Sequence, residues 1–561
     1  MIPTLEEKIR SAPFQGDIDA RLATRQQYAH DASLFEIMPS IVVAPKSSAD
    51  IQSLVKFVTR ERLRNRGDEP LLSLTARSAG TDMSGGPLTN SIVVDVTKYL
   101  NRIGSVDTQK VILQPGVFYR DLEKETVKRG VLMPAYTASK DLCTVGGMVA
   151  NNSGGEKSIK YGKTDRYVKR LKVIFSDSNE YEVRPLSKEE LDAKIAQDDF
   201  EGRLYRDLFT LIQYDYTQLQ LAKPRVSKNS SGYALWNVWN PETGVFDLTQ
   251  LITGSQGTLG IITEIEFALV PIPKYSRMAV VYMHDIARLG EIVDAIMQHA
   301  PESFESYDDY SMKLAMTFAG DFFKELGFWK ALRLGLSFIP DGLRVLTGGV
   351  PKLLLMAEVT GDDPRELERR IKNIKKEVKH FGYQTHLAKS AAEVEKYWKI
   401  RRESFNLLRK HSKGKRTAPF IDDIIVDPHY LPAFLPRIQK ILADYKLIYT
   451  IAGHAGNGNF HIIPLMKLDD PFSAELILEV SKKVYALVAE YKGSLSAEHN
   501  DGIIRTPFLS YIFPMPIIEL FEKTKAIFDP LGIFNPGKKV HGTLEAITSS
   551  LIKTHQDSHG S

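Results

Sequence analysis

The sequence predicts an α+β protein with more than one domain, and three observations lead to this fold class. The chain has 561 residues, enough for about two to four domains. In the first half, apolar runs of strand length flank loops rich in glycine. In the second half, strand-like and helix-like segments alternate, which predicts an antiparallel sheet with helices on one face.

The composition is that of an ordinary folded protein and argues against several function classes. Apolar residues make up 43% and charged residues 25% of the chain, which is not the balance of a disordered protein. The net charge of +4, from 73 basic and 69 acidic residues, is too small to indicate a nucleic-acid partner. With Cys143 as its single cysteine, the chain cannot form an internal disulfide or a cysteine-ligated zinc or iron–sulfur site.

The sequence also gives expectations about compartment and membrane. Residues 1–10 lack the apolar core of a signal peptide. The uncharged run at 447–466 contains glycines and histidines and would span a membrane poorly, so we expect no transmembrane helix. Cysteine usage favours a reducing compartment, and we expect a cytoplasmic protein. Peripheral contact with the inner face of the membrane remains an open alternative.

In the first half, a helical lead-in at residues 1–35 is expected to precede alternating strands and helices. The helix predicted at 48–60 has Asp50 in its first turn and an apolar face that includes Ile51, Leu54 and Val58. Strands are predicted at 41–45, 71–74, 92–96 and 171–175, a strand and turn at 111–116, and a further helix at 119–128. The motifs of this half stop near 272–274, where we place a domain boundary.

In the second half, strands are predicted at 278–283, 352–359 and 447–451, and helices at 287–299, 363–381 and 431–443. The helix at 363–381 begins with Asp-Pro, and its apolar residues recur at intervals of four and three. Between these elements, the segment 322–352 carries an apolar stripe flanked by basic residues. It is either a helical hairpin packed on its own domain or a helix that docks on a membrane surface or partner. The tail at 544–561 is predicted to be disordered.

The first functional motif is the loop Ala76-Arg77-Ser78-Ala79-Gly80-Thr81-Asp82-Met83-Ser84-Gly85-Gly86, which lies between two predicted strands. Small residues let the backbone approach a ligand, and successive N–H groups can converge on a phosphate. Taken alone, a glycine-rich hairpin loop without a ligand explains this stretch equally well.

Two further stretches favour the phosphate-binding interpretation of this loop over the hairpin without a ligand. One comprises Pro134 to Ser139, Thr144 to Gly155 and Tyr161 to Thr164, and the other is Leu251 to Thr263. In order and spacing the three stretches resemble the PCMH-type FAD-binding domain of the vanillyl-alcohol-oxidase superfamily. The closer resemblance is to the branch that contains D-lactate dehydrogenase, D-2-hydroxyglutarate dehydrogenase and the flavoprotein component of glycolate oxidase. It implies a two-subdomain FAD-binding domain at 36–273, a cap domain for the substrate at 274–520 with a helical insertion at about 311–350, and a segment at 521–543 that returns to the flavin.

The resemblance also assigns the cofactor contacts. FAD is expected to be non-covalent, because residues 71–164 contain no histidine and Cys143 is their only cysteine. Gln256 stands where the family usually has glutamate, which should not abolish FAD binding. The expected FAD-contacting residues are Arg77, Ser78, Ala79, Gly80, Thr81, Asp82, Gly85, Gly86, Pro134, Ser139, Thr144, Gly146, Gly147, Asn151, Asn152, Gly154, Gly155, Tyr161, Gly162, Thr164, Gly257, Gly260, Ile261, Ile262 and Asn535.

The segment from Gly453 to His461 carries two histidines separated mostly by glycine and asparagine, so a turn can bring both imidazoles together. With the later Glu498, they form a common ligand set for a divalent metal, although lone histidines are more often structural. The resemblance makes His454, His461 and Glu498 metal ligands, for Zn²⁺ first and Mn²⁺ or Fe²⁺ as alternatives. It makes His499 the general base.

The resemblance further implies that Arg401 binds the substrate carboxylate, a role for which the adjacent Arg402 is an alternative. The expected function is FAD-dependent oxidation of a D-2-hydroxy acid, with D-lactate or glycolate favoured because Ile463 offers no partner for a second carboxylate. Electrons would pass to an external quinone, cytochrome or iron–sulfur protein. The alternatives are an oxidase that uses O₂ and a non-catalytic flavoprotein subunit of a larger complex.

Overall fold

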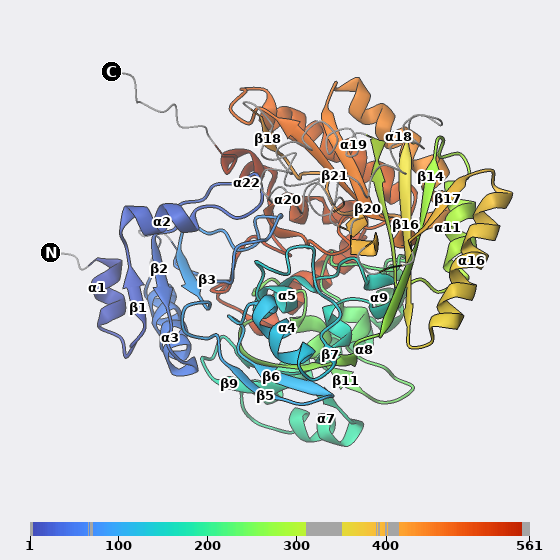
Figure 1. Cartoon of the computed structure of the whole chain (residues 1–561). Helices are drawn as coiled ribbons and strands as arrows, with labels where there is room; N and C mark the ends of the chain where they lie inside the picture. The colour runs from blue at the N-terminus through green and yellow to red at the C-terminus, as the bar shows by residue number, and fades with distance from the viewer. Residues whose placement is uncertain are drawn as a thin grey trace.

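The computed structural model describes residues 4–65, 67, 71–309, 351–388, 390, 393–395, 397–398, 401 and 415–552. Within them the chain forms an N-terminal subdomain, a second subdomain beside it and a larger cap domain (Figure 1). The mixed α+β fold predicted from the sequence is confirmed. All but the last two residues of the predicted apolar segment 322–352 lie outside the described residues.

The N-terminal subdomain is a four-stranded sheet in the order β1-β2-β4-β3. Its helix α3 begins after Ser47, whose side chain accepts from the Asp50 amide, and it buries the predicted apolar face fully. The lead-in is not entirely helical, because β1 lies within it and pairs with β2. The elements are α1 (Leu5–Arg10), β1 (Asp17–Asp19), α2 (Leu22–Tyr28), β2 (Ile41–Ala44), α3 (Ser48–Arg64), β3 (Leu74–Arg77) and β4 (Ile92–Asp95).

The loop after β3 is not part of a hairpin, which overturns that alternative for the glycine-rich stretch. Strands β3 and β4 are parallel, with Leu74 opposite Ile92. Two adjacent parallel strands need a crossover connection between them. The chain therefore has to travel back along the sheet from the end of β3 before β4 can begin and pair with it. Strand β3 begins at Leu74, whereas the sequence predicted a strand ending there, so the glycines follow the C-terminal end of the strand directly.

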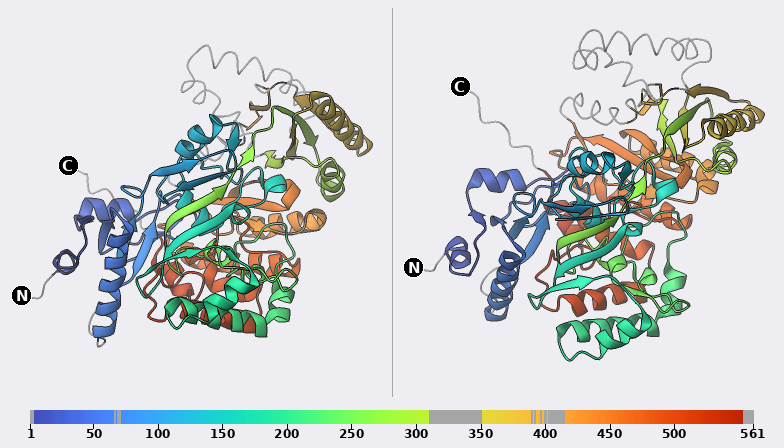
Figure 2. Two further views of the ribbon diagram at one scale, coloured as in Figure 1. Left: turned by 90° about the horizontal axis from the view of Figure 1, so that it is seen from below. Right: turned by 60° about the horizontal axis from the view of Figure 1, so that its bottom comes forward.

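The second subdomain contains a five-stranded antiparallel sheet in the order β5-β6-β12-β8-β9 (Figure 2), and α7 and α8 contribute residues to the same hydrophobic core. Its elements are β5 (Ile103–Val106), β6 (Lys110–Leu113), α4 (Tyr119–Val127), β7 (Val131–Leu132), α5 (Val145–Asn151), α6 (Ser158–Tyr161), η1 (Thr164–Arg166), β8 (Val168–Ile174), β9 (Glu180–Val183), β10 (Pro185–Leu186), α7 (Lys188–Ile195), α8 (Phe200–Tyr214), α9 (Tyr216–Ala222), η2 (Leu235–Asn237), β11 (Phe246–Asp247), α10 (Thr249–Ile252), β12 (Ile261–Ala268) and β13 (Val270–Pro271).

The cap domain is built on an antiparallel sheet in the order β17-β14-β16-β15-β20-β21-β18, with β19 also paired to β21. Helices α11, α16, α18 and α19 bury their apolar faces in one core with one face of this sheet, as predicted. The elements are β14 (Tyr275–Met283), α11 (Leu289–Met297), β15 (Ser303–Asp308), β16 (Leu353–Gly361), α16 (Pro364–His380), β17 (Gln384–Ala388), β18 (Arg416–Thr417), β19 (Ile424–Ile425), η3 (Pro428–Tyr430), α18 (Leu431–Asp444), β20 (Ile448–His454), η4 (Ala455–Asn457), β21 (Asn459–Met466) and α19 (Ser473–Glu490).

The C-terminal part returns to the N-terminal subdomain through α20 (Gly502–Arg505), η5 (Thr506–Tyr511), α21 (Met515–Phe528) and α22 (Leu544–Ser549). Phe534 forms a parallel bridge with Leu74 in β3. The prediction of a disordered tail is wrong for residues 544–552, because Thr543 caps α22 and Ile547 is fully buried. Among the described residues, no helix combines the length and the hydropathy needed to cross a bilayer.

Candidate functional site

Two neighbouring strands bring the predicted metal histidines together. Strands β20 and β21 are joined by the turn η4, and in their register Ala452 lies opposite His461 while His454 lies opposite Asn459. Alternate residues of a strand share one face, so His454 and His461 project from the same side of the sheet. Gly458 closes the turn in the left-handed region, with φ of 70°. The predicted turn between the histidines is therefore confirmed.

The proposed ligand atoms have the spacing that a metal ion requires. Nε2 of His454 lies 3.4 Å from Nε2 of His461 and 3.3 Å from Oε1 of Glu498. Donor atoms around a tetrahedral ion with bonds of about 2.1 Å are separated by about 3.4 Å. All three residues are buried or nearly so. The chemistry of two imidazole nitrogens and one carboxylate oxygen, and their two separations from Nε2 of His454, thus fit a divalent metal.

Carboxylates hold the far side of each imidazole. Oε1 of Glu305 lies 2.5 Å from Nδ1 of His454, and Oδ1 of Asp422 lies 3.1 Å from Nδ1 of His461. An ionised carboxylate only accepts hydrogen bonds, so each Nδ1 carries a proton, and Nε2 is the nitrogen of each ring that faces the cluster. Both acids are fully buried. They were not singled out in the sequence, where no local pattern marks them.

Asp422 also lies against the predicted base. Its Oδ2 lies 2.8 Å from Nδ1 of His499, whose ring stacks on that of His461 with centroids 5.0 Å apart. Burial disfavours the charged imidazole, but the carboxylates of Asp423 and Asp422 outweigh it and raise the pKa of His499 to about 9. A divalent cation beside the ring would oppose that shift.

A second grouping of donors shares part of this cluster. Ligand atoms of Asp423, His461, Glu498 and His499 all lie within 4.8 Å of one another. The Asp423 carboxylate, however, already accepts from the amides of Glu498 and His499 and from the Ser496 hydroxyl, at 2.7 to 2.8 Å. Asp423 therefore shapes the loop that carries the predicted ligand Glu498 and the predicted base His499, which leaves His454 as the predicted third ligand.

An unpredicted lysine lies inside the cluster. The ammonium of Lys228 is fully buried, is paired with Oε1 of Glu498 and donates to Oδ1 of Asn459 at 2.9 Å. Burial would raise the pKa of Glu498, but the charges of Lys228 and His454 hold it well below its usual range. Glu498 is thus ionised, which is the state that a metal ligand needs.

Arg401 lies beside the cluster. Its Nη2 is 3.5 Å from Oε2 of Glu305, the carboxylate that holds His454. The guanidinium is largely buried, with 15% of the side chain exposed. Arg402, the alternative carboxylate clamp, lies outside the described residues.

Hydrogen bonds join the predicted FAD-binding loops to one another. Asn151 donates to Oδ1 of Asp82 at 2.8 Å, and the same carboxylate accepts from the Gly86 amide at 2.7 Å. Gln256 donates to Oδ1 of Asn151 at 3.3 Å. Asn535 donates to the carbonyls of Gly86 and Gln256 at 3.0 and 2.8 Å. Asp82, Asn151 and Asn535 thus also organise the loops.

The loops contain an uncrowded glycine and a donor suited to a phosphate-bearing cofactor. The nearest atoms to a Cβ added at Gly147 would belong to the side chains of Ser78 and Thr144, at 3.5 Å or more, which is ordinary van der Waals contact. The Thr144 hydroxyl is buried and has no hydrogen-bond partner within the described part of the chain. The predicted contacts from all three stretches therefore meet around one cradle whose chemistry fits FAD.

The predicted contacts occupy four segments. Arg77 is the last residue of β3. Its guanidinium donates hydrogen bonds to the carbonyls of Tyr28 and His30, so it connects the start of the loop to the end of α2 and the residues after it. The loop after β3 contains Ser78, Ala79, Gly80, Thr81, Asp82, Gly85 and Gly86. The stretch from β7 to η1 contains Pro134, Ser139, Thr144, Gly146, Gly147, Asn151, Asn152, Gly154, Gly155, Tyr161, Gly162 and Thr164. The stretch that leads into β12 contains Gly257, Gly260, Ile261 and Ile262, and Asn535 follows the residue that bridges to β3.

The cradle and the histidine cluster are adjacent. A Cβ at Gly154 would lie 3.0 Å from Oε1 of Glu498. The side chain of Asn500, one residue after the predicted base, donates to the carbonyls of Asn151 and Gly254 at 3.2 and 2.8 Å. One site therefore combines the cofactor cradle with the ligand cluster.

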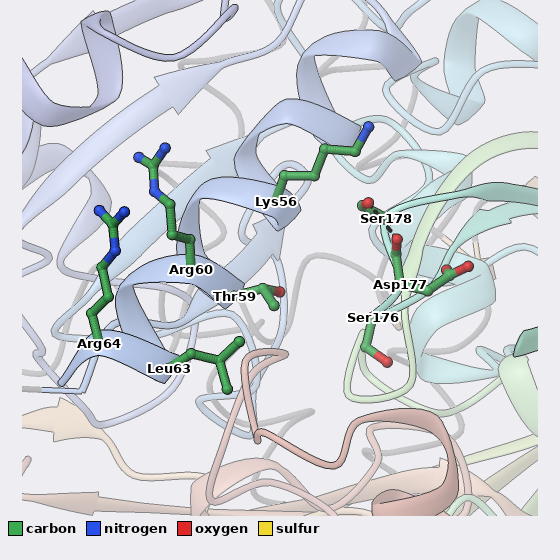
Figure 3. Close-up of a pocket in the computed structure, with 8 residues that line it drawn as sticks. All are labelled: Lys56, Thr59, Arg60, Leu63, Arg64, Ser176, Asp177 and Ser178. Atoms are coloured by element: carbon green, nitrogen blue, oxygen red, sulfur yellow. Dashed lines mark hydrogen bonds between the residues drawn. The ribbon is translucent and has the colours of Figure 1, made fainter. Parts of the chain in front are cut away.

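A surface groove between α3 and the turn after β8 is separate from this site. It has a volume of about 360 Å³ and contains none of the predicted functional residues (Figure 3). Its lining residues are Lys56, Thr59, Arg60, Leu63, Arg64, Ser176, Asp177 and Ser178.

Two protein-family models match the chain over these parts. Residues 39–184 match the FAD binding domain, and residues 272–539 match the C-terminal domain of FAD linked oxidases. The chain belongs to the FAD-linked oxidases. FAD binding is thus a property of its family, and the loops described above belong to the matched FAD-binding domain or lie beside it.

Curated relatives of this chain carry three names. It is 27% identical to D-2-hydroxyglutarate dehydrogenase of Pantoea ananatis over 95% of this chain and 51% of that protein. It is 23% identical to glycolate oxidase subunit GlcD of Bacillus subtilis (95% and 96%) and 24% identical to D-lactate dehydrogenase of Anaerostipes hadrus (91% and 92%). The chain thus spans about half the length of the first of these relatives.

Solved structures support the fold. The 4-ethylphenol oxidase of Gulosibacter chungangensis superposes with a TM-score of 0.63 at 16% identity, covering 94% of both chains. An alkyldihydroxyacetonephosphate synthase superposes with the same TM-score at 15% identity, covering 92% of this chain and 82% of the other.

Proposed function

We propose that this FAD-linked oxidase oxidises a D-2-hydroxy acid to the 2-oxo acid. The observation that carries this proposal is the convergence of His454, His461 and Glu498, with His499 beside them, against the FAD-binding loops. Relatives of all three names support the reaction class.

Two groups would supply chemistry that side chains lack. FAD, when bound in its cradle, supplies the acceptor for the hydride that leaves the α-carbon. A divalent ion, Zn²⁺ in our proposal with Mn²⁺ or Fe²⁺ as alternatives, would be held by His454, His461 and Glu498 and would polarise the substrate hydroxyl.

The side chains position the substrate and move its proton. Nε2 of His499 takes the hydroxyl proton when the ring is neutral, a state that a nearby divalent cation would favour, while Asp422 lies 2.8 Å from the opposite nitrogen. Arg401 binds the carboxylate, since a guanidinium offers paired N–H donors in the geometry that a carboxylate accepts. In this proposal, these contacts would turn the α-carbon toward the flavin and the remaining substrate substituent toward β21.

The residue along β21 favours a short substrate. Ile463 lies two positions after His461 on β21, and alternate residues of a strand share a face, so the two side chains lie on the same face. Ile463 is also buried. An apolar side chain offers no partner for a distal carboxylate, which favours D-lactate or glycolate. D-2-hydroxyglutarate is the competing substrate, supported by the names of the relatives at 27% identity.

The electron acceptor is proposed to be external: a quinone, a cytochrome or a separate iron–sulfur protein. Cys143 is the only cysteine of the chain, and it is buried, so cysteine ligands for a cluster are not available here. We propose a cytoplasmic location, with the segment 322–352 as the candidate contact to a membrane or partner.

Anaerobic flavin bleaching tests the proposal directly. The holoprotein is mixed with D- and L-lactate, glycolate and D- and L-2-hydroxyglutarate, and flavin absorbance is followed. Bleaching by a D-acid supports the proposal and identifies the substrate, whereas a flavin that no 2-hydroxy acid reduces refutes it and favours a non-catalytic subunit. Readmission of air or a quinone then separates an oxidase from a dehydrogenase by the rate of reoxidation.

A further inference from the structure

Glu305 belongs to neither the predicted ligands nor the predicted substrate contacts, yet it lies between the two groups. It comes from β15, where Ser306 lies opposite Gly453 of β20, so the same register places Glu305 opposite His454. The side chain is 1% exposed. The cap sheet therefore places this buried carboxylate beside His454.

The two oxygens of Glu305 serve different partners. Oε1 lies 2.5 Å from Nδ1 of His454, while Oε2 lies 3.5 Å from Nη2 of Arg401. The first contact is a hydrogen bond shorter than the usual charge-assisted N–H···O length, and the second is a looser ion pair. One buried carboxylate thus contacts both the metal-ligand histidine and the arginine assigned to the substrate.

These contacts have opposite consequences for the two binding events. A carboxylate on Nδ1 fixes the imidazole and increases the basicity of Nε2, and loss of such a partner typically weakens metal binding by about 10- to 100-fold. The same negative charge partly neutralises Arg401, and it therefore reduces the attraction of the guanidinium for a second carboxylate.

We propose that Glu305 is a positioning residue that couples the metal site to the carboxylate clamp. It strengthens metal binding through His454 and weakens the binding of a substrate carboxylate by Arg401. The inference rests on the proposed function of both groups. It predicts that neutralising Glu305 shifts the two affinities in opposite directions, whereas a residue needed only for packing would weaken both together.

The test uses the FAD-loaded full chain and two separate probes. Zn²⁺ affinity is measured by competition with a chromophoric chelator, and pyruvate affinity by perturbation of the flavin spectrum in metal-free protein. For Glu305→Gln we expect Zn²⁺ binding to weaken about 10- to 100-fold, with pyruvate binding several-fold tighter. Glu305→Asp keeps the charge but shortens its reach, so Zn²⁺ binding should weaken while pyruvate binding stays unchanged.

Glu358 provides the matched control. It is a buried carboxylate on the neighbouring strand β16, and it accepts from Ser276, Ser303 and Trp398. Glu358→Gln should leave both affinities unchanged. The inference is overturned if Glu305→Gln binds Zn²⁺ as tightly as the wild type, or if both affinities fall together with the unfolding temperature. Wild-type protein that binds no Zn²⁺ would instead refute the proposed metal function.

Discussion

Lys228 is a buried cation beside one of the proposed metal ligands. Its ammonium is paired with Glu498, the proposed ligand carboxylate, and it supplies a positive charge there in the metal-free site. Removing one partner of a buried ion pair typically costs about 3–5 kcal/mol. For Lys228→Met we expect a loss of that order in the unfolding free energy of the metal-free holoprotein, and a larger stabilisation by added Zn²⁺ than in the wild type.

Lys163 is the control that separates loss of the ion pair with Glu498 from loss of a buried lysine in general. Its ammonium is also buried, but it donates to the carbonyls of Asn229 and Ala497 and to the Ser230 hydroxyl. Lys163→Met should lose stability without gaining extra stabilisation from Zn²⁺. Calorimetric unfolding with and without Zn²⁺ measures both variants, and equal Zn²⁺ responses would contradict the compensating role of Lys228.

His461 tests whether metal and flavin are held independently. Its partners, Asp422 and His454, belong to the cap sheet and its neighbouring turn, whereas the FAD contacts lie in other segments. We expect His461→Ala, or treatment with EDTA, to leave the FAD spectrum intact and to reduce substrate bleaching at least 100-fold. His429→Ala changes an exposed histidine, 77% exposed, and should behave as the wild type. Full turnover in metal-free enzyme would contradict the ligand assignment.

Asp31 gives a prediction for the pH dependence of stability. Its Oδ2 is buried without a hydrogen-bond partner in the described chain, and burial together with the nearby charge of Asp82 raises the pKa of Asp31 to about 7. A carboxyl whose folded pKa is raised contributes stability that is complete below about pH 4 and is lost as the pH rises through 7.

Asp31→Asn should remove this loss. The variant is expected to be more stable than the wild type above pH 7, by roughly 2 kcal/mol, and to show a flatter profile between pH 4 and 7. Urea unfolding at a series of pH values provides the measurement. A stability difference that does not change with pH across this interval would show that Asp31 is ionised in the folded protein throughout.

At the scale of elements, the turn η4 determines whether the histidines converge. Gly458 has φ of 70°, and an added Cβ would lie 2.0 Å from the carbonyl oxygen of Val426. An alanine in the left-handed region costs about 1–2 kcal/mol of folding stability. The clash of its Cβ with the backbone adds to this cost, because the segment at Val426, just after β19, has to move. We expect Gly458→Ala to lose about 3 kcal/mol or more of stability and to weaken Zn²⁺ binding markedly.

Gly382 supplies the comparison for this substitution. It also has positive φ, 83°, but nothing lies within 4 Å of an added Cβ. Gly382→Ala should therefore show only the cost of strain, about 1 kcal/mol, and normal Zn²⁺ affinity. Thermal unfolding and chelator competition on both variants distinguish the contributions, and similar behaviour of the two would show that η4 does not position the ligands.

The elements were largely predictable from local pattern, while the partners of the site were not. Helix α16 follows its apolar spacing and its Asp-Pro start, and the turn between the histidines follows from glycine and asparagine. Glu305, Asp422 and Lys228 are separated from their partners by 149, 39 and 270 residues. Such contacts arise only from sheet order and the docking of domains, so no sequence window contains them.

At the scale of the whole molecule, ion pairs connect the second subdomain to the cap. Glu302, just before β15, is paired with Lys157 and Lys160 beside and within α6, at 2.6 and 3.0 Å. Lys228, from the second subdomain, reaches Glu498 after the cap sheet. Because both links lie around the site, the distance between cofactor cradle and ligand cluster is held by charge pairs as well as by packing.

The segment between β15 and β16 can be tested as a docking element because both of its ends are fixed. Asp308 at the end of β15 lies opposite Leu353 at the start of β16, and these strands are antiparallel neighbours. A chain that leaves and re-enters at paired residues can be replaced by a short hairpin turn without changing the sheet. The sequence places in this segment an apolar stripe with Phe328, Trp329 and Leu332, flanked by basic residues.

We expect replacement of residues 311–350 by an Asn-Gly turn to leave the protein folded, yellow and active with a small soluble dye as electron acceptor. Activity with membranes or the native acceptor should fall at least tenfold, because burial of three or four large apolar side chains contributes a few kcal/mol of docking energy at roughly 25 cal/mol per Å². A matched variant with Phe328, Trp329 and Leu332 changed to Ser keeps the chain length and should show the same selective loss. If dye and membrane activities fall together, or if FAD is lost, the segment packs on its own cap and electrons leave by another surface.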